Sequence, residues 1–172
     1  MKKNFIFRIK YGLFLLAILM VFPLTVSARN LIMARAADAT GLDPHTQTAF
    51  ASLRLLELIY EPLVVLDEKL NIVPALAESW SFSSDGKVLT FKLRKGVTFH
   101  DGSKMTAKDV IASFNRILTE KTGAATRANF LSIQSIEEQG QNTVVFHLSR
   151  PDVPILTAMT DTNASIISSD II

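Results

Sequence analysis

The sequence predicts an α/β domain, and three local patterns lead to this fold class. Residues 80–93 alternate apolar and polar side chains on both sides of Asp85-Gly86, which is typical of a β-hairpin with one buried face. Residues 106–109 have the form of a capping box, and the apolar residues after them recur every three or four positions, as in an amphipathic helix. Short apolar runs and helical stripes otherwise follow one another in mixed order, without repeats or linkers.

The elements expected before the hairpin are short. The apolar run 31–34 is expected to be a buried first strand, and the stretch 39–45, which contains Gly and Asp-Pro, a loop. Residues 50–59 carry an apolar stripe at helical spacing. This helix is expected to end just before Pro62, because proline disfavours a helical conformation in the residue before it. Residues 63–66 are expected to form another strand.

The second half of the chain predicts one further strand, one short helix and an apolar end. Residues 144–148 alternate as a half-buried strand does, and the acidic pair 137–138 before them is expected to be a solvated turn. Asp152 is expected to cap a short helix that ends near Met159. Residues 165–172 are expected to be an apolar strand.

The positive charge of the chain lies at one end. The 172 residues include 18 basic and 16 acidic side chains, with a net charge of +2 and a pI near 9.0. Residues 1–28 contain four basic residues and no acid, which leaves 14 basic against 16 acidic residues in 29–172. The basic pI therefore does not indicate nucleic-acid binding, and no nucleic-acid partner is expected.

Residues 1–28 are expected to be a signal peptide. A basic start, an apolar stretch over 11–26 and the small residues Ser27 and Ala28 predict cleavage after Ala28. An uncleaved anchor is the alternative, but a 16-residue helix is about 24 Å long and the hydrocarbon core about 30 Å thick. The chain has no cysteine, which excludes a disulfide and a lipid-modified Cys after the leader. We therefore expect a periplasmic domain over 29–172.

Sequence motifs of catalysis are absent. The chain has no Gly-rich phosphate loop, no nucleophile elbow and no thiol. Ser84 and Lys87 have Ser-x-x-Lys spacing, but they flank the hairpin turn and do not open a helix. The three histidines lie far apart, without a second ligand at metal-binding spacing. We expect no catalytic residues, no metal and no cofactor.

Several segments together resemble the signature of the family 5 extracytoplasmic solute-binding proteins, the peptide, opine and nickel receptors of ABC importers. The segments that carry the main resemblance are 74–80, 84–86, 90–102 and 106–110. Further similar stretches are 42–45, 60–63 and 164–168. The resemblance runs in order over nearly all of residues 31–172.

This resemblance implies a periplasmic binding protein of type II, in which two α/β lobes close on a solute. Family members are several times longer, so 29–172 are expected to be a first lobe with its small subdomain, without the second lobe. The expected solute is an oligopeptide or dipeptide, and the expected partners are the permease subunits of an ABC importer. The resemblance implies seven cleft residues: Thr48, Ala49, Phe50, Ala51, Asp161, Thr162 and Asn163.

Each of these assignments has an alternative. Phe50 could begin the apolar stripe of its helix, Thr48 could cap that helix, and Asp161 and Asn163 could simply form a turn. Asn163 falls near a position that is arginine in nickel receptors, which counts against nickel. The alternative functions are a receptor for nickel or another small solute, and a non-binding remnant or permease-interaction fragment.

Overall fold

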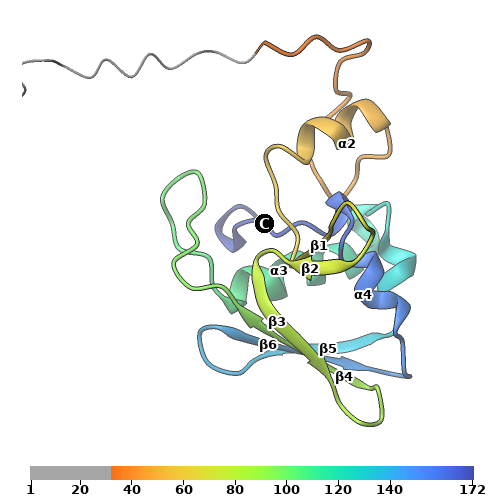
Figure 1. Ribbon diagram of the computed structural model, residues 1–172, viewed down its shortest axis with the longest axis vertical. Helices are drawn as coiled ribbons and strands as arrows, with labels where there is room; N and C mark the ends of the chain where they lie inside the picture. The colour runs from red at the N-terminus through yellow and green to blue at the C-terminus, as the bar shows by residue number, and fades with distance from the viewer. Residues whose placement is uncertain (1–31) are drawn as a thin grey trace, which may run out of the picture. The chain divides into compact units, whose positions relative to one another are not determined.

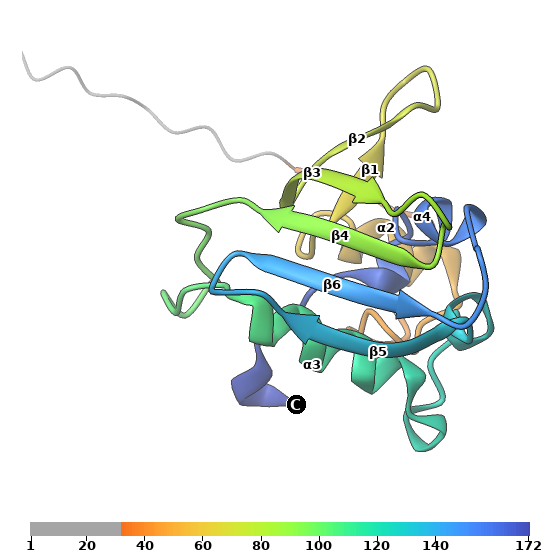
Figure 2. The ribbon, with the colours of Figure 1, turned by 90° about the horizontal axis from the view of Figure 1, so that it is seen from below.

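A four-stranded antiparallel sheet organises the structure, a computed structural model that describes residues 32–172 (Figure 1). Figure 2 shows its strands in the order β3–β4–β6–β5. Their bounds are β3 Ala77–Phe82, β4 Val88–Leu93, β5 Ile133–Glu138 and β6 Thr143–Leu148. The strands predicted over 80–93 and 144–148 are therefore confirmed. The acidic pair expected to be a turn instead ends β5, where Glu137 and Glu138 pair with Val145 and Val144 and keep their side chains exposed.

The hairpin β3–β4 follows the predicted alternation. Trp80 lies opposite Phe91, and Gly86 at the turn has a φ of +68°, which glycine adopts without strain. Leu89, Phe91 and Leu93 are buried, whereas the side chains between them point to the other face. Lys92 is exposed on that polar face and pairs with Glu78 at 3.8 Å. The basic side chains of this hairpin are thus part of a solvated sheet face.

Helix α3, Ala107–Leu118, packs against β5 and β6 and completes the core. Its predicted capping box is confirmed: the Asp109 carboxylate accepts a hydrogen bond from the Thr106 backbone N–H at 2.7 Å. On the apolar face of the helix, the Phe114 ring meets the rings of Phe146 and Phe130 edge to face, at centroid distances of 5.0 and 5.4 Å. These aromatic contacts fix α3 on the sheet.

The other face of α3 is polar and binds distant parts of the chain. The Ser113 hydroxyl accepts from the Ile167 N–H at 3.0 Å and donates to the Ile167 carbonyl at 3.2 Å. Asp109 accepts from the Ser169 N–H at 2.8 Å, and Arg116 reaches the loop before α2. The three side chains recur at helical spacing, so they lie along one face of α3.

Two smaller elements precede the sheet. Helix α2, Phe50–Leu56, is shorter than predicted, because Leu58 and Ile59 form tight i→i+3 hydrogen bonds after it. Strand β1, Val64–Leu66, confirms the strand predicted over 63–66 and pairs with β2, Ile72–Pro74. The loop predicted over 39–45 is also confirmed.

Three predictions at the two ends are wrong. Residues 32–34 are exposed and form no strand. Asp152 does not cap helix α4, Pro154–Ala158; its carboxylate accepts from the Ser132 hydroxyl at 2.6 Å. Residues 165–172 form no strand, because the Ile167 backbone is satisfied by the Ser113 side chain. The 3₁₀ turn η3, Thr162–Ala164, precedes this segment, and a second one, η4, Ser169–Ile171, lies within it.

The elements described above all belong to one unit, Ala36–Ile172. The signal peptide predicted over 1–28 lies outside the described residues. Within residues 32–172, none of the helices combines the length and the apolar character that crossing a bilayer requires.

Candidate functional site

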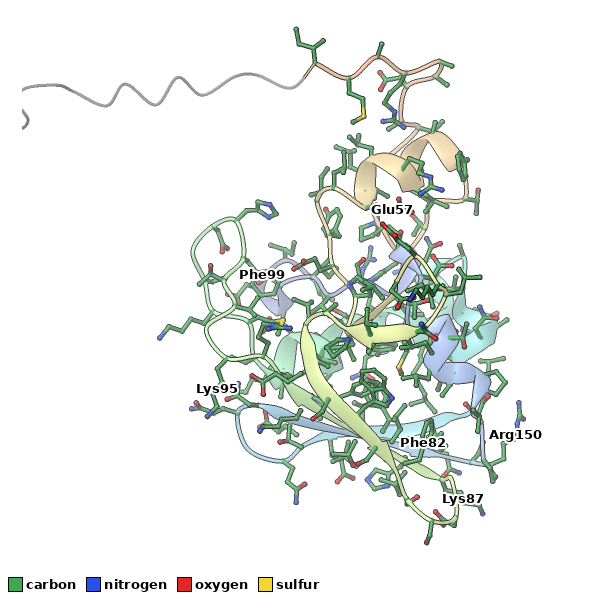
Figure 3. The ribbon with its side chains drawn as sticks, in the orientation of Figure 1. Glu57, Phe82, Lys87, Lys95, Phe99 and Arg150 are labelled. Atoms are coloured by element: carbon green, nitrogen blue, oxygen red, sulfur yellow. The ribbon has the colours of Figure 1, made fainter. Side chains whose placement is uncertain are left out.

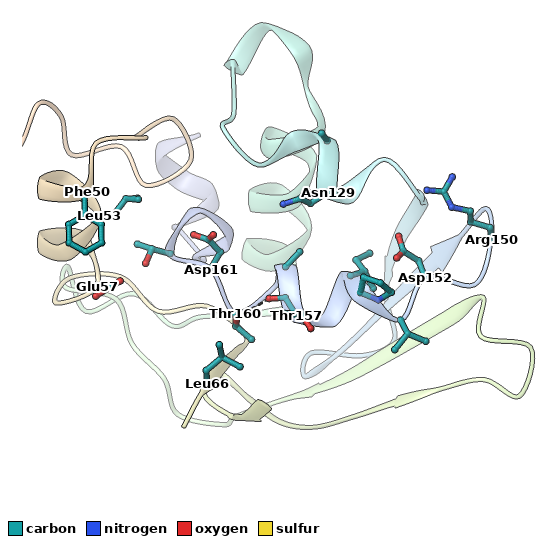
Figure 4. Close-up of a pocket in the computed structure, with 16 residues that line it drawn as sticks. Phe50, Leu53, Glu57, Leu66, Asn129, Arg150, Asp152, Thr157, Thr160 and Asp161 are labelled. Atoms are coloured by element: carbon teal, nitrogen blue, oxygen red, sulfur yellow. Dashed lines mark hydrogen bonds between the residues drawn. The ribbon is translucent and has the colours of Figure 1, made fainter. Parts of the chain in front are cut away.

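An open groove of about 1080 Å³ lies on the surface of the described part of the chain (Figure 4). Its walls come from α2, the end of β1, the 3₁₀ turn η2 (Arg127–Phe130), α4 and η3. The lining residues that carry the argument below are Phe50, Leu66, Asn129, Val153, Asp161 and Thr162. This volume is large enough for a small peptide or a solute of similar size.

The α2 wall presents an aromatic ring to the groove. Phe50 is 70% exposed, whereas Leu56 at the other end of α2 is fully buried. The Arg54 guanidinium lies 4.8 Å from the centroid of the Phe50 ring and also pairs with Glu57 at 2.8 Å. Phe50 is therefore not part of the core, and the alternative that it begins the buried stripe is wrong.

The opposite wall is polar and is formed by η3 together with α4. Asp161 is exposed, and its carboxylate accepts from the Asn163 N–H at 3.0 Å, which caps η3. Figure 4 shows Asp161 between Leu53 of α2 and Asn129 of η2. Thr162 follows in the same wall and is 9% exposed. Asp161 thus combines the turn-forming role with a place on the groove.

The charges of the groove are mixed. Glu57 and Asp161 line it near α2, and Arg150 and Asp152 line its far end (Figure 4). Exposed apolar side chains, Leu66 among them, lie between these groups. Figure 3 shows that Arg150 lies on the same side of the molecule as Lys87, which precedes β4, and far from Lys95, which follows that strand. A lining that is partly apolar and carries both signs of charge suits a zwitterionic solute better than a polyanion.

The seven predicted cleft residues divide into two groups. Phe50, Asp161 and Thr162 come from two distant segments and line the same groove. Thr48, Ala49, Ala51 and Asn163 are not among the lining residues. Thr48 does not cap α2 either, since the N-cap position is Ala49 and no side chain caps it.

Asn163 has a different role from the predicted one. It is 4% exposed, and its Nδ2 donates to the carbonyls of Pro44 and of Gln47, the latter at 2.9 Å. A buried amide with two acceptors in the loop 43–48 holds that loop against η3. Asn163 therefore shapes the groove from behind and is more than a turn former.

Three further side chains hold the same loop. Arg116 donates from Nη1 to Asp43 Oδ1 at 3.0 Å and to His45 Nδ1 at 2.9 Å, and from Nη2 to Asp43 Oδ2. His45 is fully buried, and its Nε2 lies 3.0 Å from the Ser165 carbonyl. We call Asp43, His45, Arg116 and Asn163 the loop anchor. Together they tie the loop 43–48 to α3 and to the segment that follows η3.

The charge states in the loop anchor follow from these contacts. Hydrogen bonding from Arg116 lowers the pKa of Asp43 below 3.8, and burial only partly opposes this effect. Burial lowers the pKa of His45 below 6.5, and the charge of Arg116 acts in the same direction. At neutral pH Asp43 is therefore ionised, and His45 is neutral.

Sequence reasoning missed Arg116, Asn129 and the residues of α4. Arg116 occupies the polar side of an amphipathic helix, a position that equally fits a solvated side chain, and its partner Asp43 lies 73 residues away. No local pattern reports such a pairing. Among residues 32–172, no group of three His, Cys, Asp or Glu side chains is placed to hold a metal ion.

Comparison with known proteins gives one matching family model. Residues 71–171 match the model of the bacterial extracellular solute-binding proteins, family 5 Middle. The dipeptide-binding protein of Escherichia coli K12 is 30% identical over 181 residues, which cover 94% of this chain and 34% of that protein. The chain spans between about a fifth and a third of the length of the curated relatives it matches.

Two solved structures are similar in fold and sequence. AgaA from A. tumefaciens R10, in complex with agropinic acid, has a TM-score of 0.75 and 34% identity over 78% of this chain and 27% of its own. The periplasmic binding protein DppA from Helicobacter pylori, in complex with the peptide STSA, has a TM-score of 0.68 and 33% identity over 78% of this chain and 30% of its own. The predicted fold class, the α/β first lobe of a periplasmic binding protein, is confirmed.

Proposed function

Because the chain belongs to the family 5 bacterial extracellular solute-binding proteins, we propose that residues 29–172 form the first-lobe wall of a receptor that captures dipeptides or oligopeptides for an ABC importer. The groove carries this proposal. The two segments that the resemblance assigns to the cleft, around Phe50 and around Asp161, lie 111 residues apart in the chain and line the same groove. A ligand site built from distant segments is what a binding lobe requires.

The chemistry of the groove supports a peptide. Receptors of this kind hold peptides through main-chain groups and terminal charges, with side-chain pockets that tolerate variety. The groove offers an exposed aromatic face at Phe50, a carboxylate at Asp161 and a guanidinium at Arg150. An amino terminus would be favoured near Asp161 and Glu57, and a carboxylate near Arg150.

The names of the similar proteins also favour peptides. The Escherichia coli relative that matches along 94% of this chain is a dipeptide-binding protein, and the Helicobacter pylori structure holds a peptide. The AgaA structure holds agropinic acid, so an opine is the competing solute. Asn163 does not favour nickel, because its amide is used by loop carbonyls and does not line the groove.

The remaining features of the proposal follow from the receptor role. The partners would be the permease subunits of the importer, and the chain would act by binding, without catalysis. The leader 1–28 would deliver it to the periplasm and be removed after Ala28.

The test is a nuclear magnetic resonance titration of the 172-residue chain, which detects millimolar binding to a single wall. Dipeptides and tetrapeptides, nickel with histidine, and agropinic acid would be added in separate series. We expect peptides to shift the amide signals of α2, η3 and α4. Shifts with agropinic acid or nickel and none with peptides would overturn the substrate class. An unperturbed groove in all series would overturn the receptor proposal.

Matched variants locate the binding surface. Phe50→Ala and Asp161→Ala are expected to weaken the peptide response. Leu70→Ala and Asp170→Ala replace an exposed leucine and an exposed aspartate outside the groove and are expected to leave it unchanged. Equal responses in all four variants would place the peptide elsewhere.

A further inference from the structure

The loop anchor contains a buried histidine, His45, whose two ring nitrogens are both engaged, so that a second ring proton would find no acceptor. Arginine can only donate hydrogen bonds, so His45 Nδ1 must accept from Arg116 Nη1 at 2.9 Å. The ring proton is then on Nε2, which donates to the Ser165 carbonyl at 3.0 Å. A second proton would have to enter at Nδ1, where it would face the Arg116 N–H and bring two positive charges into contact. The contacts seen here therefore require a neutral ring.

The groups around the His45 ring compensate for its protonation only in part. Among residues 32–172, the charged groups that act on the ring are Arg116 of α3 and Asp43 of the same loop. Asp43 would favour a charged ring, but both of its oxygens already accept from Arg116. The other neighbours are uncharged: the Ser165 carbonyl on one side, and the Ala125 N–H that donates to the His45 carbonyl at 2.9 Å. Protonation therefore breaks the His45–Arg116 contact.

The anchored loop leads directly into the groove. Residues 43–48 are followed by α2, whose first residue, Phe50, lines the groove. The Thr40 N–H donates to the Ser52 hydroxyl at 2.9 Å, which ties the chain before the loop to α2. Loss of the loop anchor frees the segment that positions the Phe50 ring.

We propose that the loop anchor is a pH-responsive device: mild acid protonates His45, releases the loop 43–48 from α3 and loosens the Phe50 wall of the groove. The part that concerns the groove rests on the proposed function; the release of the loop does not. The lowered pKa of His45 sets the direction in which the stability of the anchored loop changes with pH. The unfolded or released chain takes up a proton as the pH falls below 6.5, whereas the anchored ring does not until its own lower pKa. The stability that the neutral His45 ring gives to the anchored state is therefore complete above about pH 6.5 and decreases progressively below that pH.

Hydrogen exchange of the 172-residue chain tests the release. The reporters are the Ala125 N–H, bonded to the His45 carbonyl, and the His45 N–H, bonded to Asp43 Oδ1 at 3.0 Å. After correction for the intrinsic exchange rate, their protection relative to β4 and β6 amides should fall roughly tenfold for each pH unit below 6.5, until the anchored ring protonates. His45→Gln keeps a neutral donor and acceptor and should abolish this dependence. His100→Gln replaces an exposed histidine and should retain it.

The possible results distinguish protonation of His45, release of the loop 43–48 and the effect on the groove. Protection in the wild type that does not depend on pH, or that falls equally in His45→Gln, overturns the proposal. If His45→Gln does not fold, the imidazole signals of the wild type decide: protonation of His45 must coincide with loop release, and protonation without release refutes the proposal. Because these readouts need no solute, they remain valid if peptides fail to bind. Loop release that leaves the Phe50 ring signals unchanged would refute the coupling to the groove.

Discussion

Replacement of Asn163 by alanine tests whether this residue is an anchor or a solute contact. The side chain is 4% exposed and donates two hydrogen bonds to loop carbonyls. A typical hydrogen bond contributes about 1 kcal/mol, and a buried acceptor left without a partner costs about 1–3 kcal/mol. Since Pro44 is buried and Gln47 only half-buried, we expect Asn163→Ala to lower the free energy of unfolding by about 2–4 kcal/mol.

Urea unfolding of the 172-residue chain measures this loss. With an m-value of about 2 kcal/mol/M, the midpoint should move down by about 1–2 M. Asn129→Ala is the matched control, because Asn129 is exposed on the groove and its replacement should change the free energy of unfolding by about 0.5 kcal/mol or less. If the midpoint of Asn163→Ala equals that of Asn129→Ala, Asn163 does not hold the loop and the anchor reasoning is wrong.

Three other predictions concern the core, α2 and acid stability. Phe146→Ala removes a ring that contacts two others at 5.0 and 5.7 Å and should cost about 3–5 kcal/mol in urea unfolding, whereas a loss below 1 kcal/mol would contradict the aromatic core. Leu56→Ala should lower the free energy of unfolding by about 2–5 kcal/mol and Phe50→Ala by less than about 1 kcal/mol. Equal losses would show that Phe50 is part of the core. The lowered pKa of Asp43 contributes stability that is complete above about pH 3.8 and is lost as the pH falls through the pKa of Asp43 in the folded state. The urea midpoint, measured from pH 5 to pH 2, should therefore fall more steeply in the wild type than in Asp43→Asn.

Local patterns predicted the elements whose stability is local. The β3–β4 hairpin follows from strict alternation around Asp85-Gly86, and α3 follows from its capping box and its apolar spacing. Both patterns report which face is buried against neighbours close in sequence. The resemblance to solute-binding proteins added the pairing of the Phe50 and Asp161 segments, which no periodicity contains.

Three departures from the predictions share one cause, which is a bonding partner outside the local sequence. The segment 165–172 is apolar enough for a strand, but the Ser113 hydroxyl satisfies its backbone at Ile167. Asn163 has the composition of a turn, but its amide reaches carbonyls about 116 residues away. Asp152 has the composition of a helix cap, but Ser132 occupies its carboxylate. A side chain that bonds a distant backbone leaves no trace in local spacing.

The polar face of α3 bears on the order in which the protein opens. The sheet, α3 and their aromatic contacts lie within residues 77–148, whereas Asp109, Ser113 and Arg116 hold segments 54 to 73 residues distant. The loop 43–48 is held to α3 by polar contacts, whereas the sheet depends on a continuous apolar core, to which Ile166 also belongs. Partial opening should therefore begin with residues 43–48, at a lower free energy than global unfolding. In the proposed receptor, a groove wall that follows such a weakly held segment can rearrange around a solute while the sheet and α3 stay folded.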